Sequence, residues 1–147
     1  MPKVSTQINA SPQQVWEIIG NGNRLNEWFS PVDAIRGAEP APAIEAGSEF
    51  KVRMIGRVSR SRFRVHEAIT DQKLRAALGP IFAHPIGIPM QAEILVEPSG
   101  DGSNVSVELS CHRITGPLQQ RISGVDPDHE APATLARLKA LAEDNAA

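Results

Sequence analysis

The sequence Pro132–Glu143, PATLARLKALAE, decides the fold that we predict for this chain. Leu135, Leu138 and Leu141 recur at three-residue spacing and form one apolar helical face, opposite charged side chains. One helix cannot bury such a face by itself. Most of the chain before residue 114 has the pattern of short strands and turns, so we expect this helix to pack on the inner face of a single sheet.

Alternating apolar and polar residues predict the strands of that sheet. The expected strands lie near residues 4–8, 32–36, 47–54, 60–66, 73–78, 90–96 and 105–111. The segment Glu67–Gln72 is expected to break the fourth strand. Hairpin turns are expected at Gly56 and at Ser99–Gly102, where Ser-Gly-Asp-Gly joins two antiparallel strands.

Helix signals follow the first strand. Ser11 is suited to an N-cap and Pro12 to the first helical position, where the missing N–H costs nothing. This short helix should stop at Gly20–Gly22, and a second short helix is expected over Asn23–Phe29. A further helical piece is expected over Thr115–Ser123. The final helix should begin between residues 128 and 133.

Length and composition bound the class of protein. The 147 residues fit one domain, residues 1–147, that can bury a core without metals or disulfides. Hydrophobic residues make up 41% and charged residues 22%, which excludes disorder, and no window has the apolar length of a membrane helix. A net charge of -2 gives no general attraction to nucleic acid. No signal peptide is recognisable, so we expect a cytoplasmic protein without integral membrane contact.

Two short motifs then carry a family resemblance. Asn9–Trp16, NASPQQVW, a glycine break, and Leu25–Trp28, LNEW, ahead of a proline resemble the opening of the SRPBCC (START/Bet v 1-like) superfamily of polyketide cyclases, dehydrases and lipid-transport proteins. The resemblance implies an α+β helix-grip fold: a curved antiparallel sheet of about six or seven strands around a long C-terminal helix, with two short helices after the first strand. It also implies a hydrophobic cavity between sheet and helix. No residue of these motifs is catalytic across the superfamily, so the resemblance implies no active site.

The inward strand positions and the helix face supply the expected cavity lining. The predicted lining residues are Trp28, Phe29, Phe50, Val52, Met54, Phe63, Val65, Leu74, Phe82, His84, Ile86, Met90, Ile94, Val107, Leu109, Leu135 and Leu138. Trp28 and Phe29 are included because the second short helix borders the cavity in the family. Large rings are scarce, and alanines such as Ala136 and Ala140 flank the leucines of the final helix. We therefore expect this helix to be a cavity wall.

The apolar segment Gly79–Pro89, GPIFAHPIGIP, has too many prolines and glycines for a regular central strand. It is either a loop folded onto the edge of the core or a hydrophobic mouth over the cavity. His84 lies between Phe82 and Ile86. It is either an ordinary loop histidine or a polar group that orients a ligand or moves a proton.

The remaining charged residues fit a solvated surface. Seven basic residues lie between Arg53 and Arg75, and alternation places most of them on the outer face. Glu93, Glu97 and Glu108 on the same face can form cross-strand ion pairs, and no aromatic residue interleaves with the arginines to stack bases. We expect no nucleic-acid binding, although an acidic protein partner is an alternative.

The sequence contains no recognisable metal or nucleotide motif. The four histidines are scattered, and neither HExxH nor GxGxxG is present. Cys111 is the single cysteine and is expected to be a buried, inert thiol. We expect no metal site and no cofactor.

Together these observations predict binding of a hydrophobic or amphipathic small molecule, such as a lipid, polyketide or aromatic metabolite, in a cavity between sheet and C-terminal helix. The alternative is a polyketide cyclase- or dehydratase-like enzyme acting in the same cavity. For that alternative His84 is a weak catalytic candidate, and Glu67 and Asp33 are more remote ones. A homodimer is compatible with the sequence.

Overall fold

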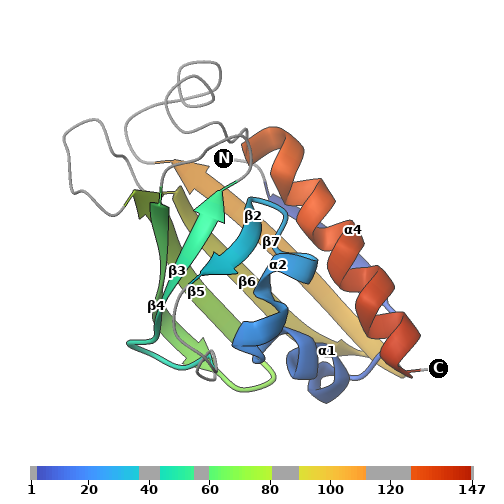
Figure 1. Ribbon diagram of the computed structural model, residues 1–147. Coiled ribbons are helices and arrows are strands. Elements are labelled where there is room, and N and C mark those ends of the chain that lie inside the picture. The colour runs from blue at the N-terminus through green and yellow to red at the C-terminus, as the bar shows by residue number, and fades with distance from the viewer. Residues whose placement is uncertain (1–2, 37–43, 55–59, 81–89, 112–126, 147) are drawn as a thin grey trace.

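The computed structural model describes residues 3–36, 44–54, 60–80, 90–111 and 127–146 (Figure 1). Its strands are β1 (Lys3–Ile8), β2 (Val32–Arg36), β3 (Glu49–Met54), β4 (Arg60–Ile69), β5 (Lys73–Pro80), β6 (Met90–Ser99) and β7 (Gly102–Cys111). They form one antiparallel sheet in the order β1-β7-β6-β5-β4-β3-β2. Its helices are α1 (Pro12–Ile19), the 3₁₀ turn η1 (Gly22–Arg24), α2 (Leu25–Trp28) and α4 (Pro127–Ala146).

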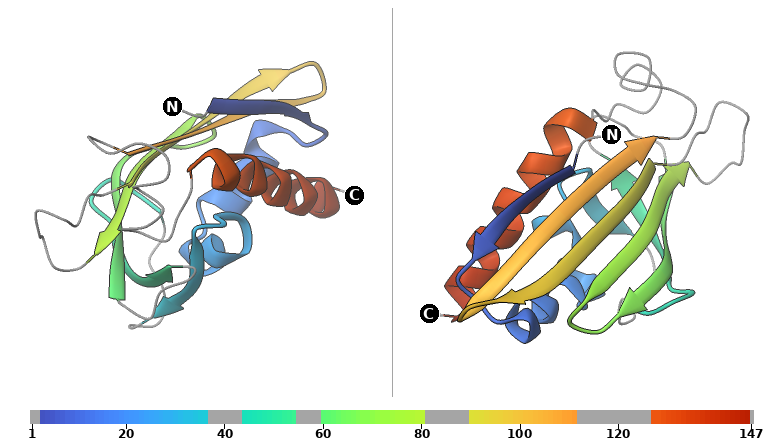
Figure 2. Two further views of the ribbon diagram at one scale, coloured as in Figure 1. Left: turned by 90° about the horizontal axis from the view of Figure 1, so that it is seen from above. Right: turned by 180° about the vertical axis from the view of Figure 1, so that it is seen from behind.

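The sheet bends around α4, and α1 and α2 lie on the same side of the sheet (Figure 2). Helix α4 packs on β7 and β1 and also contacts α1 and α2. The core is therefore enclosed between one sheet and one layer of helices. This arrangement confirms the predicted α+β helix-grip fold.

Helix α1 begins where the sequence predicts. The Ser11 hydroxyl accepts a hydrogen bond from the Gln14 backbone N–H at 3.2 Å, and the Gln14 side chain accepts one from the Ser11 N–H at 2.8 Å. This reciprocal capping box satisfies two N–H groups that the helix itself leaves unpaired. Pro12 occupies the first turn, and Val15 and Ile18 are buried on the inner side.

Strand β4 is longer than predicted. The register shifts between Val65 and Glu67, so a bulge interrupts the alternation while the strand continues to Ile69. The chain reverses in a tight turn in which the Gln72 N–H donates to the Ile69 carbonyl at 2.9 Å. The expectation that Glu67 ends the strand was wrong because a bulge and a turn disturb the alternation in the same way.

The β6–β7 hairpin confirms the predicted Ser-Gly-Asp-Gly turn. Ser99 pairs with Gly102, and Gly100 has a φ of 59°, which suits glycine at the first of two loop residues. A Cβ on Gly102 would lie 2.3 Å from the Ile8 carbonyl oxygen. Glycine at this position therefore allows β1 to approach the start of β7.

Helix α4 begins at Pro127, before the expected range, and Pro132 lies inside it. The Pro132 ring is exposed and removes one backbone bond near the start of the helix, where few bonds are lost. Ala136 and Ala140 are also exposed, so the expectation that they form part of the inner wall was wrong. The buried side of α4 consists of Glu130, Ala131, Thr134, Leu135, Leu138 and Ala142. The expected turn at Gly56 and the helical piece Thr115–Ser123 lie outside the described residues.

The C-terminal half of α4 covers the edge of β1. The Lys139 ammonium donates to the Gln7 carbonyl at 3.1 Å, and the Glu143 carboxylate accepts the Asn9 N–H at 2.9 Å. Lys139 and Glu143 also pair with each other across one helical turn. These bonds occupy backbone groups beside an edge strand that would otherwise be open to another chain. The Asn9 N–H and then Lys139 lower the pKa of Glu143 below its ordinary value of 4.5.

Because the pKa of Glu143 is lower in the folded state, its stabilising contribution is present above about pH 4.5 and is lost as the pH falls through the folded-state pKa. We predict that Glu143→Gln lowers the urea midpoint of unfolding at pH 7 and that the difference from wild type shrinks as the pH is lowered from 4.5 to 3. Asp144→Asn removes the same charge from an exposed neighbour and should leave the midpoint nearly unchanged. An undiminished difference at pH 3 would contradict the role of this carboxylate.

Candidate functional site

The inner side of the sheet is an apolar surface that extends from β3 to β7. Its buried side chains, each at most 3% exposed, are Val52, Phe63, Val65, Leu74, Ala76, Leu78, Met90, Ala92, Ile94, Val96, Val105, Val107 and Leu109. Leu135 and Leu138 of α4 are buried as well. The predicted inward orientation of these strand positions is thus confirmed. Their contact with a ligand remains a prediction.

The smallest side chains of this surface meet at the centre of the sheet. Ala76 of β5 pairs directly with Ala92 of β6, and both are buried. The pairs on either side are larger, with Leu74 opposite Ile94 on one side and Leu78 opposite Met90 on the other. The layer of side chains on the inner face of the sheet is therefore shallowest at the Ala76–Ala92 pair.

Three aromatic rings link α2 to the inner face of β4. The ring centroids of Trp28 and Phe29 lie 5.5 Å apart, and those of Phe29 and Phe63 also lie 5.5 Å apart with nearly perpendicular planes. All three side chains are fully buried. Edge-to-face pairs of this kind hold rings in fixed orientations. The predicted positions Trp28, Phe29 and Phe63 are thus brought together inside the fold.

A buried polar cluster joins α4 to the segment after α2. It consists of Ser30, Glu130 and Thr134, and Glu130 is only 4% exposed. The Ser30 N–H donates to the Thr134 hydroxyl at 3.2 Å, and the two hydroxyls lie 3.0 Å apart. The Ser30 hydroxyl is also 3.1 Å from a carboxylate oxygen of Glu130 and 3.2 Å from the Glu130 carbonyl.

The hydrogens of this cluster can be distributed without leaving a donor unpaired. If the Ser30 hydroxyl donates to the Glu130 carboxylate, the Thr134 hydroxyl can donate to Ser30 while it accepts the Ser30 N–H. Among the described residues, Oε2 of Glu130 makes no hydrogen bond or ion pair. The cluster thus fixes the N-terminal part of α4 and leaves Oε2 of Glu130 without a partner among the described residues.

Sequence reasoning missed these three residues. Glu130, Thr134 and Leu138 follow one another at four-residue spacing, so extending the apolar stripe of α4 backwards would have placed both polar side chains on the buried face. Ser30 carries no comparable signal, because nothing in the local sequence shows that α4 contacts it.

The indole of Trp28 is the second polar feature of the interior. Its side chain is fully buried, and its Nε1–H has no acceptor within the described structure. The other tryptophan, Trp16, is only partly buried. Trp28 therefore contributes a buried donor that has no acceptor among the described residues.

Several predicted site residues, or their side chains, lie outside the part of the chain that the structure describes. Phe82, His84 and Ile86 lie outside the described residues, and the side chains of Phe50, Met54 and Asp33 are likewise not described. The catalytic role of His84 therefore stays a prediction.

Glu67 is a poor candidate for chemistry in the interior. Its carboxylate lies 3.0 Å from the Lys73 ammonium, and both side chains are partly exposed. The hydrogen bond from Lys73 and its charge lower the pKa of Glu67. A surface carboxylate that is held ionised in this way is unsuited to donating a proton inside the fold.

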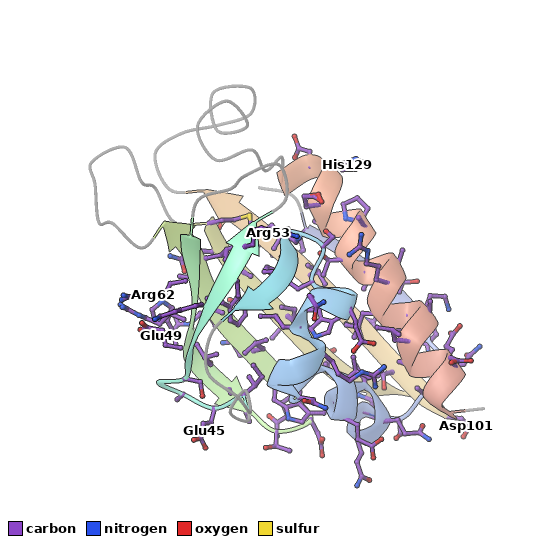
Figure 3. All side chains as sticks on the ribbon, in the orientation of Figure 1. Glu45, Glu49, Arg53, Arg62, Asp101 and His129 are labelled. Carbon is purple, nitrogen blue, oxygen red and sulfur yellow. The ribbon has the colours of Figure 1, made fainter. Side chains whose placement is uncertain are left out.

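The outer face carries ion pairs. Arg62 and Arg64 of β4 lie 3.0 and 3.1 Å from the carboxylate of Glu49 on β3. In Figure 3, Arg62 and Glu49 point away from the helices and outward from the sheet. His66 and His129 are exposed, and the described residues contain no group of three or more metal-ligating side chains. None of the described helices has the length and apolar character needed to cross a membrane.

Comparison with known proteins agrees with this architecture. Residues 1–143 match the family model described as polyketide cyclase / dehydrase and lipid transport. The chain belongs to this family. Comparison with curated protein sequences finds no match.

Solved structures share the fold of this family member at low sequence identity. MLL2253 from Mesorhizobium loti aligns over 97% of this chain and 96% of its own, with a TM-score of 0.70 and 19% identity. The Aha1 dimer from Colwellia psychrerythraea aligns over the full length of both chains at TM-score 0.66 and 18% identity. The di-domain ARO/CYC StfQ from the steffimycin biosynthetic pathway aligns over 99% of this chain and 51% of its own, at TM-score 0.67 and 13% identity. At such identities the likeness establishes the fold.

We predict that Thr134→Val destabilises the protein by about 1–3 kcal/mol, because it leaves the buried Ser30 N–H without an acceptor. Ser30→Ala removes the hydroxyl from the other side of the same cluster. The double variant should be less destabilised than the sum of the single variants, by about 0.5–3 kcal/mol. Urea unfolding gives the free energy of unfolding of the wild type, the two single variants and the double variant. Strictly additive changes in this free energy would show that the cluster does not act as a unit.

Proposed function

We propose that the protein binds a hydrophobic or amphipathic small molecule, such as a lipid, polyketide or aromatic metabolite, between the inner face of the sheet and α4. The observation that carries this proposal is the apolar inner surface of the sheet, whose smallest side chains, Ala76 and Ala92, lie at its centre. Affinity would come from burial of apolar area, at about 25 cal/mol per Å². The chain belongs to a family whose description includes lipid transport, which supports the proposed binding of a hydrophobic molecule.

The arrangement also fits the usual composition of small-molecule sites. Such sites are lined mainly by apolar and aromatic side chains, with a few polar groups that orient the ligand. Here the apolar part is the sheet, the aromatic part is Trp28, Phe29 and Phe63, and the polar part is the cluster around Glu130. The interior thus offers each component that the binding of an amphipathic molecule requires.

Introducing bulk at the central Ala76–Ala92 pair should test this proposal. We predict that Ala76→Leu weakens the binding of a neutral, hydrophobic fluorescent probe about tenfold or more, because the added side chain occupies ligand space. Ala77→Leu is the matched control, since Ala77 is the next residue of β5 and faces the other side of the sheet. Binding is measured by fluorescence titration and by native mass spectrometry after incubation with a lipid extract.

A wild-type protein that takes up neither probe nor lipid would contradict the proposed function. Equal loss of affinity in the two leucine variants would contradict the location of the ligand on the inner face.

A second candidate function is a cyclase- or dehydratase-like enzyme acting on a ligand in the same place. The observation that favours it is Glu130, a buried carboxylate with one oxygen held by Ser30 and the other without a partner among the described residues. A carboxylate in this setting is suited to accept a proton from a carbon next to a ketone. The family description names cyclases and dehydrases, which supports the same candidate.

For this candidate we predict that Glu130→Gln abolishes the conversion of a poly-β-ketone thioester. The conversion is measured by liquid chromatography and mass spectrometry. The glutamine retains an acceptor for Ser30, so the variant should fold and bind the thioester. Conversion at the wild-type rate would remove Glu130 from the chemistry.

A further inference from the structure

The Trp28 indole N–H is a buried donor that has no acceptor among the described residues. Its side chain has 0% exposure, and no described oxygen or nitrogen lies within hydrogen-bonding distance of Nε1. Leaving such a donor unpaired costs about 1–3 kcal/mol, which is why buried donors are nearly always satisfied. A fully buried indole whose N–H is unpaired therefore points to an acceptor that none of the described residues supplies.

Neighbouring groups do not fill this role. The ring beside the indole is Phe29, which has no oxygen or nitrogen acceptor. The hydroxyl of Ser30, two residues further along, is already engaged with Glu130 and Thr134.

We propose that Trp28 Nε1–H donates a hydrogen bond to a neutral oxygen of the bound molecule, so that the ligand is an oxygenated apolar compound such as a ketone or phenol. This inference rests on the proposed function, because it assigns a polar contact to the ligand of that same interior. It narrows the ligand class by excluding pure hydrocarbons.

The charge of the neighbourhood selects against an anionic ligand. Ser30 bonds to the Glu130 carboxylate, so that carboxylate lies in the same part of the interior as the indole. No described lysine or arginine pairs with Glu130 to neutralise it. A ligand carboxylate would have to give up its hydration beside the Glu130 carboxyl group, whereas a ketone or hydroxyl oxygen carries no charge to desolvate.

Three naphthalene probes distinguish a neutral oxygenated ligand from a hydrocarbon and from an anionic ligand. Methyl naphthyl ketone and isopropenylnaphthalene differ only by oxygen in place of a CH₂ group, and naphthoate carries a negative charge at pH 7. Their dissociation constants are measured for wild type, Trp28→Phe and Trp16→Phe. The Trp28→Phe change removes the N–H and keeps an aromatic ring, while Trp16→Phe makes the same change at the other tryptophan.

We expect naphthoate to bind more weakly than the ketone. We also expect the preference for ketone over isopropenylnaphthalene to fall about fivefold to tenfold in Trp28→Phe and to persist in Trp16→Phe. An unchanged preference in Trp28→Phe overturns the inference while the proposed function stands. Failure of the wild type to bind any of the three naphthalenes overturns the inference, and the proposed function is overturned as well if the fluorescent probe and the lipid extract also fail to bind.

A nuclear magnetic resonance measurement on the wild type removes any dependence on the folding of Trp28→Phe. The sequence contains two tryptophans, so the spectrum should contain two indole N–H signals, which Trp16→Phe assigns. The Trp28 signal should move further downfield with methyl naphthyl ketone than with isopropenylnaphthalene, because both probes share the ring-current effect of the naphthalene and only the ketone accepts a hydrogen bond. Equal movement with both probes would overturn the proposed hydrogen bond.

Discussion

The structure depends on burial of one face of α4 by the bent sheet. The helix presents Leu135, Leu138 and Ala142 to this interior, and the sheet supplies apolar side chains from β3 to β7. Neither element can exist alone, because each has an apolar face that water would otherwise solvate. Polar contacts then fix where the helix lies: Lys139 and Glu143 attach it to β1, and Glu130 and Thr134 attach it to Ser30.

These two sets of polar contacts differ in their surroundings. Those of Lys139 and Glu143 are open to water, which screens them, so they mainly close the edge of the sheet. The Ser30–Glu130–Thr134 cluster is buried, where a hydrogen bond is electrostatically stronger and an unpaired group is more costly. The best-defined polar geometry of the described residues thus begins directly after the aromatic rings in the chain, because Ser30 follows Phe29.

Much of the fold could be predicted from local patterns. The N-cap at Ser11, the turn at Ser99–Gly102 and the inward strand positions depend on residues close together in sequence, and each is confirmed. Errors arose where two causes give one pattern. A bulge at Val65–Glu67 disturbs the alternation of apolar and polar residues in the same way as a turn. A proline such as Pro132 is typical of the first helical position, but here it lies in the second turn of a helix that begins at Pro127. The alanines at 136 and 140 were assigned to the wrong side because the apolar stripe was read from the leucines alone.

By itself the sequence determined which residues alternate, where helices are capped and which family the opening motifs resemble, because these properties depend on neighbouring residues. Only the tertiary structure decided that Ser30 meets Glu130 and Thr134 across about a hundred residues, and that the buried Trp28 indole has no acceptor among the described residues. A hydrogen bond between distant segments has no periodicity, so no local pattern encodes it. Whether a polar side chain is satisfied depends on every element packed around it.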